Sequence, residues 1–256
     1  MNTYLHNICK AGAGLALALA CTSGAWGTTH QMEQLNRGVV AIKKTGGVMV
    51  TWRFLGTDKS TTSFNLYRDG VLVNSTPLTS VTNYLDANGT TSSTYTVKAV
   101  NSGTEGEASA AASVWSDIHK EIQLQLPTGG TDLSGNAYTY TPNDMSVGDL
   151  DGDGDYELVV KWDPSDSKDN SNSGYTGNVY LDAYEIDGTF MWRIDLGINV
   201  RAGAHYTQYL VYDFDGDGKA EVVCRTAPGT IDGKATQCLW AATARQPTTE
   251  TRAAMC

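Results

Sequence analysis

Short runs of alternating apolar and polar residues, separated by Gly, Ser, Thr and Asn, dominate the first half of the chain. Alternation with a period of two is typical of half-buried β-strands. The clearest runs lie at residues 35–42, 48–54, 64–68 and 93–100. An Asp69-Gly70 pair separates residues 64–68 from the apolar residues 71–73, which is a hairpin signal. Short strands at this spacing predict a small antiparallel β-sandwich of the fibronectin type III kind over residues 28–115.

One face of this predicted sandwich carries large apolar side chains. The alternation assigns to the core Trp52, Phe54, Leu66, Tyr95 and Val97. The alternative interpretation is that these side chains form a stripe that binds a ligand. Residues 101–113 are rich in Gly, Glu and Ala and show little periodicity, so they predict a connection or the last turn of the sandwich.

The pattern changes after Trp115. Residues 122–126 alternate and predict a strand. Residues 179–184 and 190–196 flank an Asp187-Gly188 turn and predict a second hairpin. Long polar loops rich in Thr, Gly, Asn and Asp separate these runs, so the second half of the chain is also expected to be all-β.

Two acidic stretches repeat within this half, at residues 149–157 and 213–221. Both copies place acids at the first, third, fifth and ninth positions and glycines at the fourth and sixth. Ca²⁺ takes six to eight oxygen ligands, and a short acidic loop bent by glycines can supply them. The predicted metal ligands are Asp149, Asp151, Asp153, Asp155 and Glu157, and Asp213, Asp215, Asp217, Lys219 and Glu221. Lys219 is compatible with this set because a calcium loop offers a backbone carbonyl at the seventh position.

The sequence around each acidic stretch excludes an EF-hand, which places its bidentate Glu at position twelve between two helices. Each stretch instead runs directly into β-branched residues and is preceded by valine, so a strand–loop–strand hairpin is expected. Such hairpins occur in calcium-binding β-propellers. The two copies begin 64 residues apart, which suits a propeller blade with an insertion. About two blades fit within residues 116–234. The alternative is a pair of acidic surface turns without metal.

The two ends of the chain differ from this β-rich middle. Residues 1–27 combine Lys10, an apolar run and small residues, the pattern of a secretory signal peptide, so an extracellular or periplasmic protein is expected. A lipoprotein anchor at Cys21 is the alternative. The apolar run is too short to span a bilayer. Residues 235–256 lack alternation and turn signals, and they are expected to be disordered or out of frame.

The formal net charge of −10 argues against a nucleic-acid partner. It does not exclude an anionic carbohydrate, because the dominant acids are the predicted metal ligands themselves.

Five segments together resemble the rhamnogalacturonan lyases of polysaccharide lyase family 11. These segments are residues 37–41, 64–70, 143–154, 161–165 and 201–208, and the resemblance extends over about residues 31–234. It implies a small β-sandwich followed by an eight-bladed, calcium-binding propeller, and β-elimination of the rhamnogalacturonan I backbone of pectin by a monomer. Because the chain departs from the family pattern after residue 234, we expect a truncated propeller and an inactive N-terminal fragment.

The resemblance also assigns roles to residues. Asn143 and Asp163 match positions that contact the substrate in the family. Lys161, Arg201, His205 and Tyr206 are further candidates for substrate binding, since Arg201 suits a uronate carboxylate. A metal ion would stabilise the enolate charge that develops during elimination. The alternative is that these residues have structural roles. Asn143 and Asp163 would then form turns, and His205 would make its hydrogen bonds within the protein.

The same sequence features also agree with two functions other than a lyase. One is a calcium-stabilised module that binds polysaccharide without catalysis. The other is an adhesion-type propeller that binds a protein. An unsaturated product that absorbs in the ultraviolet would distinguish the lyase from both.

Overall fold

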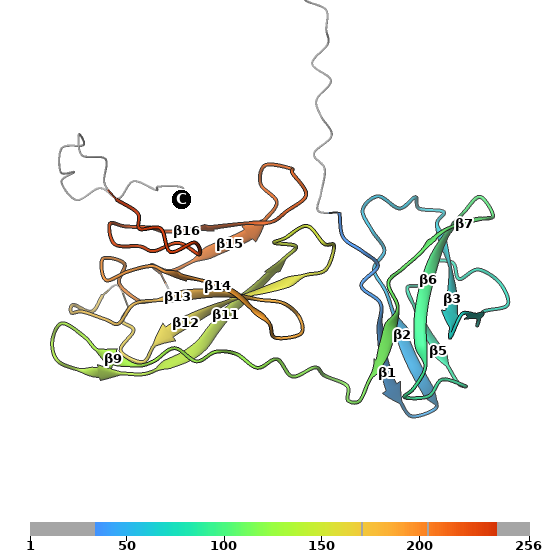
Figure 1. Ribbon diagram of the computed structural model, residues 1–256, viewed down its shortest axis with the longest axis horizontal. Helices are drawn as coiled ribbons and strands as arrows, with labels where there is room; N and C mark the ends of the chain where they lie inside the picture. The colour runs from blue at the N-terminus through green and yellow to red at the C-terminus, as the bar shows by residue number, and fades with distance from the viewer. Residues whose placement is uncertain (1–33, 170, 204, 240–256) are drawn as a thin grey trace, which may run out of the picture. The chain divides into compact units, whose positions relative to one another are not determined.

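A computed structural model of the protein describes residues 34–169, 171–203 and 205–239, and every regular element within these ranges is a β-strand (Figure 1). The all-β prediction is therefore confirmed. The predicted signal peptide at residues 1–27 and all of the predicted tail beyond residue 239 lie outside the described residues. No helix among the described residues is long and apolar enough to cross a bilayer.

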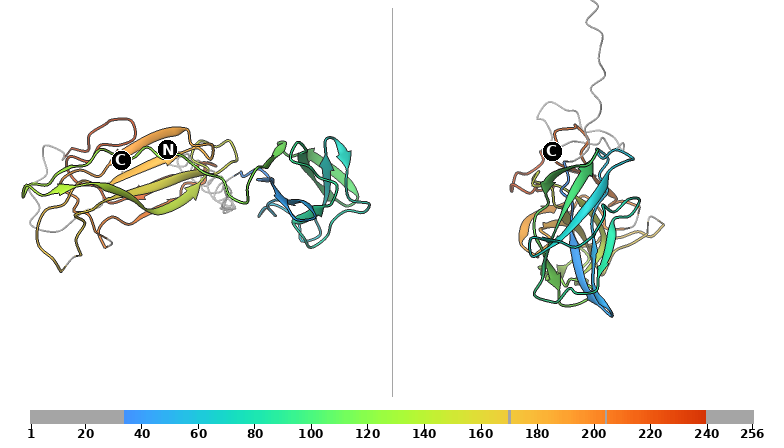
Figure 2. Two further views of the ribbon diagram at one scale, coloured as in Figure 1. Left: turned by 90° about the horizontal axis from the view of Figure 1, so that it is seen from below. Right: turned by 90° about the vertical axis from the view of Figure 1, so that its right-hand side faces the viewer.

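The first eight strands form one continuous sheet in the order β4-β3-β6-β8-β1-β2-β5, with β7 paired to β6. Their bounds are β1 (Val40–Lys44), β2 (Gly47–Thr51), β3 (Ser63–Arg68), β4 (Val71–Leu72), β5 (Asn83–Asp86), β6 (Thr94–Asn101), β7 (Thr104–Ala108) and β8 (Ala112–Trp115). Strand β8 pairs in parallel with β1 and antiparallel with β6, and this double pairing joins the two halves of the sheet. The strands coloured blue to green curl around a common interior (Figure 2).

The core of this curled sheet confirms four of the five predicted core residues. Trp52, Leu66, Tyr95 and Val97 are buried there, together with Ala41, Val48, Val50 and Phe64. The prediction for Phe54 is wrong, since its side chain is 49% exposed. Strand β2 ends at Thr51, so the alternation no longer applies three residues later. The Phe54 ring instead packs edge-on against Phe64, with the ring centroids 6.2 Å apart.

Strand β7 and the first two residues of β8 lie within residues 101–113, for which the sequence predicts only a connection or turn. All five residues of β7 are exposed. This strand is held by its backbone pairing with β6 and not by an apolar face. An exposed strand carries no hydrophobic alternation, which is why the pattern does not reveal it.

The second group of strands contains a four-stranded antiparallel sheet in the order β11-β12-β13-β14. The bounds in this group are β9 (Gly130–Thr131), β10 (Ala137–Tyr138), β11 (Tyr140–Gly148), β12 (Glu157–Pro164), β13 (Tyr180–Tyr184), β14 (Phe190–Asp195), β15 (Tyr209–Tyr212) and β16 (Glu221–Cys224). The predicted hairpin around Asp187-Gly188 is confirmed as β13 and β14. Strands β15 and β16 form a separate antiparallel pair.

Strand β12 is buried on both faces, apart from the half-buried Asp163. Val159 packs into one apolar cluster with Leu181 and Leu196, while Leu158 and Val160 pack into another with Tyr184. Neighbouring residues of a strand point to opposite faces, so β12 contributes to the packing on both sides of its sheet.

The predicted strand at residues 122–126 is absent. The segment is extended, but its backbone bonds to side chains in place of a neighbouring strand. The Gln125 amide donates to the Tyr184 hydroxyl at 3.0 Å, and the Arg193 guanidinium donates to the Gln125 carbonyl at 3.1 Å. Ile122 and Leu124 still pack against the Leu158–Val160 side of the sheet, which explains the apolar alternation.

Candidate active site and metal loops

The two acidic stretches form loops with the same internal hydrogen bonds. The first loop, residues 149–156, joins β11 to β12, and the second, residues 213–220, joins β15 to β16. Asp149 is fully buried, and its carboxylate accepts from the amides of Gly152 at 2.7 Å and Gly154 at 2.9 Å. Asp213 in the second loop accepts in the same way from Gly216 at 2.6 Å and Gly218 at 3.0 Å. The repeat in the sequence is therefore a repeat in structure.

The glycines of the loops have the conformations that the predicted tight bend requires. Gly152 and Gly154 have φ angles of 84° and 92°, and Gly216 and Gly218 have 79° and 95°. These positive values favour glycine, because a side chain there would be strained. The bend turns the acids between the glycines to the same side as the first Asp of each loop.

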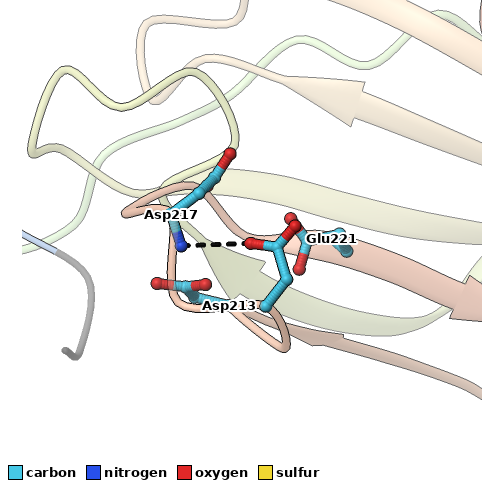
Figure 3. Close-up of side chains that lie close together, drawn as sticks. Asp213, Asp217 and Glu221 are labelled. Carbon is cyan, nitrogen blue, oxygen red and sulfur yellow. Dashed lines mark hydrogen bonds between the residues drawn. The ribbon is translucent and has the colours of Figure 1, made fainter. Parts of the chain in front are cut away.

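Carboxylates gather in both loops at a spacing that fits one cation. Oxygens of Asp149, Asp151 and Asp153 lie within 4.8 Å of one another, and so do those of the second set, Asp213, Asp215, Asp217 and Glu221. Figure 3 shows three members of the second set, Asp213, Asp217 and Glu221, gathered around the turn of the loop. Clustered carboxylate oxygens are typical ligands of hard divalent cations such as Ca²⁺.

Three of the predicted ligands stand outside these carboxylate clusters, namely Asp155, Glu157 and Lys219. For Asp155 and Lys219 the prediction rests on the backbone carbonyl of the seventh position, and both amides do take part in the loop. The Asp155 amide donates to Asp153 at 2.8 Å, and the Lys219 amide donates to Asp217 at 2.9 Å.

Glu157 places a further buried carboxylate beside the first loop. Its side chain is fully buried, and one carboxylate oxygen accepts from the Leu150 amide at 2.6 Å. The other oxygen is buried without any hydrogen-bond partner. Burial raises the pKa of Glu157 to about 7, and the neighbouring carboxylates of Glu185 and Asp151 add to the effect. A cation bound by the neighbouring acids would offset this repulsion.

The two loops contact each other, and the first loop also contacts segments that flank strands β1 and β2. The Ala220 amide of the second loop donates to the Asp149 carbonyl of the first at 2.6 Å. The Asn36 amide donates to the Gly154 carbonyl at 2.8 Å. The Arg53 guanidinium lies over the Tyr156 ring, with its Cζ 4.4 Å from the centroid. The first loop is therefore held from three directions.

The candidate substrate residues lie toward the other end of the β11–β12 hairpin. Strands β11 and β12 lose register between Pro142 and Met145, so Asn143 and Asp144 form a bulge. The Lys161 ammonium, whose side chain is 2% exposed, pairs with the Asp144 carboxylate at 2.5 Å. This ion pair joins the two strands of the hairpin at the bulge. Asn143 is exposed beside this pair.

Asp163 lies two residues beyond Lys161 on β12 and therefore on the same face of the strand. One oxygen of its carboxylate is buried and has no hydrogen-bond partner. Burial raises the pKa of Asp163 above its usual value, and this effect outweighs the attraction of Lys161. A buried polar atom without a partner is uncommon and marks a position where a ligand can bind.

Sequence reasoning missed Tyr209, which completes this group. Its hydroxyl lies 2.8 Å from the Val159 carbonyl and 3.2 Å from the Asp144 carbonyl. Burial and the nearby Asp144 raise the pKa of Tyr209 to about 12, so the hydroxyl is a donor at neutral pH. Tyr209 opens β15, and only the pairing of distant strands brings it to the bulge. The residue spacing holds no signal for this contact.

The other predicted substrate-binding residues, Arg201, His205 and Tyr206, form a separate cluster. The Arg201 guanidinium donates to the carbonyls of Asn172 at 2.5 Å and Asp169 at 2.8 Å, and to the Tyr206 hydroxyl at 3.1 Å. A bidentate grip on a carboxylate would require some of these bonds to break. His205 is exposed, and its Nδ1 lies 3.5 Å from the Asp169 carboxylate. Among the described residues, no hydrogen bond or ion pair joins this cluster to Lys161 or Asp163.

The first acidic loop lies far from Asp163 along strand β12. Asp163 lies six residues beyond Glu157 on the same strand. At roughly 3.3 Å per residue, this separation is about 20 Å. An ion held in the first loop would therefore lie too far from Asp163 to contact a ligand bound there.

Two family descriptions match the chain. The β-sheet domain of rhamnogalacturonan I lyases matches residues 30–115, and the C-terminal domain of rhamnogalacturonan lyase family 11 matches residues 119–245. The second range extends beyond residue 234, where the sequence predicted that the resemblance would end. An all-β chain with two matched acidic loops thus belongs to the rhamnogalacturonan lyases of family 11.

Individual relatives agree with this assignment. The chain is 59% identical over 213 residues to the rhamnogalacturonan endolyase YesW of Bacillus subtilis (strain 168), a match that covers 83% of this chain and 34% of that protein. It is 58% identical over 205 residues to the rhamnogalacturonan exolyase YesX of the same organism, covering 80% and 34%. The chain thus spans about a third of the length of these relatives.

Solved structures show the same partial match. The crystal structure of YesW has a TM-score of 0.79 at 57% identity and covers 86% of this chain and 37% of that one. The rhamnogalacturonan lyase of Bacillus licheniformis has a TM-score of 0.78 at 55% identity, covering 88% and 38%.

Proposed function

We propose that this chain contributes part of the substrate site of an enzyme that cleaves the rhamnogalacturonan I backbone by β-elimination. The observation that carries the proposal is the meeting of Asp144, Lys161 and Asp163 at one end of the β11–β12 hairpin, with a buried carboxylate oxygen left unpartnered. Relatives named as an endolyase and an exolyase of rhamnogalacturonan support it.

The chemistry of the reaction agrees with these groups. In a uronate, a base removes the proton on the carbon beside the carboxylate, the bond to the leaving oxygen breaks, and a carbon–carbon double bond forms. A cationic group near the carboxylate stabilises the negative charge that develops. In our proposal Lys161 has this role, while Asn143 and Asp163 contact the sugar. The raised pKa of Asp163 makes its carboxyl easier to protonate than an ordinary aspartate, which suits a group that exchanges protons with the substrate.

In the proposal Ca²⁺ is the cation of both acidic loops, where it neutralises the gathered carboxylates and stiffens the hairpins. Asp149 and Asp213 orient each loop through its glycine amides, and the remaining acids of each loop offer free oxygens. The oxygen-rich donor set supports Ca²⁺ over softer metals.

The proposal includes the finer architecture and the location of the protein. Residues 28–115 form a fibronectin-type sandwich, and residues 116–234 form about two blades of a propeller, of which the meander β11–β14 is one. Residues 1–27 direct export, and the protein acts as a monomer. Because the chain spans about a third of its relatives, we propose that the 256-residue chain alone is inactive.

A chimera tests the catalytic role directly. In it, residues 31–234 of this chain replace the matching segment of the B. subtilis endolyase YesW, and the ultraviolet absorbance of the unsaturated product reports turnover. We expect Asp163→Asn to lower kcat/KM at least 100-fold, whereas Asp187→Asn, in an exposed turn, leaves it unchanged. Full activity of the Asp163→Asn chimera, or turnover by the 256-residue chain alone, would contradict the proposal. Tight binding of rhamnogalacturonan by an inactive chimera would favour a binding module.

A further inference from the structure

A cleft on the curled sheet of strands β1–β8 holds features that the lyase reaction does not use. Its volume is about 360 Å³, and its lining includes Phe54, Phe64, Ser80, Thr82 and Asn83. Phe54 lies outside the core, and its side chain is about half exposed.

The aromatic part of the cleft is rigid. Phe64 is 1% exposed and belongs to the core, and Phe54 packs edge-on against it. The Phe64 backbone bonds in both directions with Leu78, at 2.9 and 2.8 Å. Phe54 therefore presents its remaining ring surface to solvent from a fixed base. An exposed ring on a rigid support provides contact area at low cost in conformational entropy.

The polar part of the cleft is free to bind. Among the described residues, the side chains of Ser60, Ser80 and Asn83 have no hydrogen-bond partner. Ser80 adopts a φ of 61°, a conformation that non-glycine residues rarely adopt. Such strain often accompanies functional positions. Two hydroxyls and one amide offer both donors and acceptors within one small cleft.

The cleft carries no net charge. None of the described residues that line it is acidic or basic. The Arg37 guanidinium lies 5.3 Å from the Phe64 ring centroid, and it is neutralised by a two-pronged pair with Asp58 at 2.5 and 2.8 Å. An uncharged ligand therefore fits better than the uronate backbone, which needs cationic partners.

We infer that this cleft is a second carbohydrate site, which binds one or two rings of an uncharged saccharide. The apolar face of a sugar ring would stack on Phe54, while its hydroxyls would bond with Ser80 and Asn83. A volume near the lower end for ligand pockets suits such a small ligand, and the affinity is in the millimolar range. On a polymer, a second weak site increases the overall affinity through effective concentration.

The inference is tested by NMR titration of the isotope-labelled, full 256-residue chain with neutral disaccharides of galactose and of arabinose. We expect the amide signals of residues 54, 80 and 83 to shift with a millimolar Kd for at least one of them. Phe54→Ala should weaken binding at least 10-fold, and Phe54→Trp should retain it. The matched control is Leu72→Ala, which removes another half-exposed apolar side chain of the same sheet. A second variant, Asn83→Ala, keeps the aromatic packing and should weaken binding several-fold.

Four results would overturn the inference. The first is the absence of shifts with either neutral disaccharide, and the second is equal binding by Phe54→Ala and the wild type. The third is stronger binding of digalacturonate than of the neutral sugars at residue 54. The fourth is self-association through Phe54, seen as a concentration-dependent sedimentation coefficient that Phe54→Ala abolishes. These readouts do not involve cleavage, so they are independent of the proposed lyase activity.

Discussion

Two aspartates of the N-terminal sheet region differ in how deeply they are buried. Asp86 is 2% exposed at the end of β5, while Asp69 is an exposed turn residue. Two carboxylate oxygens of Asp86 accept from the Arg68 guanidinium at 2.6 and 2.8 Å, and the Tyr95 hydroxyl donates to it at 2.9 Å. Burial alone would raise the pKa of Asp86, but these bonds outweigh it and hold the pKa below its usual value.

This shift predicts how acid affects the sandwich. A carboxyl with a lowered folded-state pKa contributes stability that is complete above its unfolded pKa of about 4 and is lost as the pH falls through the folded value. We therefore expect Asp86→Asn to lower the Tm by several degrees at pH 7, and the difference from the wild type to shrink below about pH 4. Circular dichroism melts from pH 7 to pH 2.5 measure this difference in Tm, with Asp69→Asn as the control. A difference that stays constant down to pH 2.5 would contradict the ionic explanation.

Strand elements were predictable where their signals are local. The hairpins at Asp69-Gly70 and Asp187-Gly188 form as expected, because turn chemistry and apolar alternation lie within a few residues. Residues 122–126 show the limit, since their alternation reflects packing while their hydrogen-bond partners are the side chains of Tyr184 and Arg193. The acidic loops were predictable from spacing alone. The contact of Tyr209 with the Asp144 bulge was not, because it depends on how two hairpins pack.

A buried polar network links the strands of the β11–β14 sheet. Asp182 on β13 is fully buried and accepts twice from Arg193 on β14, both times at 2.6 Å. The Trp162 indole of β12 donates to the same carboxylate at 2.8 Å, and the Tyr184 hydroxyl donates at 2.9 Å. Arg193 also holds the 122–126 segment through the Gln125 carbonyl, so one carboxylate joins three strands and the edge of the sheet.

Loss of Arg193 should destabilise this sheet strongly. Arg193→Met keeps the length of the side chain but leaves the Asp182 charge buried and uncompensated, which typically costs about 3–5 kcal/mol. Urea unfolding should show a lower midpoint for this variant and no change for Lys120→Met at an exposed position. The double variant Arg193→Met with Asp182→Asn should recover most of the loss, because it removes the charge and keeps an oxygen that accepts from Trp162 and Tyr184. If the double variant is no more stable than Arg193→Met, the buried charge is not the cause.

At the scale of the whole molecule, the two acidic loops are one connected unit. The Ala220 amide bonds to the Asp149 carbonyl at 2.6 Å. The side-chain carbons of Lys219 lie so close to Gly152 that a Cβ there would come within 3.1 Å of Lys219 Cε. The Lys219 side chain, from the seventh position of the second loop, therefore packs against the first loop. Ordering either loop therefore helps to order the other.

Binding of Ca²⁺ to the two loops should consequently be coupled. Asp217→Asn removes a carboxylate of the second loop only, yet we expect it to weaken binding at the first loop as well, by about 5-fold or more, because coupling between sites is typically of this size. Isothermal titration with Ca²⁺ measures both sites, and Asp153→Asn should weaken the second loop by the same factor, since coupling is reciprocal. A chelator should lower the Tm of the wild type more than that of either variant, because ligand bound to the folded state alone stabilises it. If each site binds Ca²⁺ with an affinity that the variant of the other loop does not change, the contact between Ala220 and Asp149 does not couple the two sites.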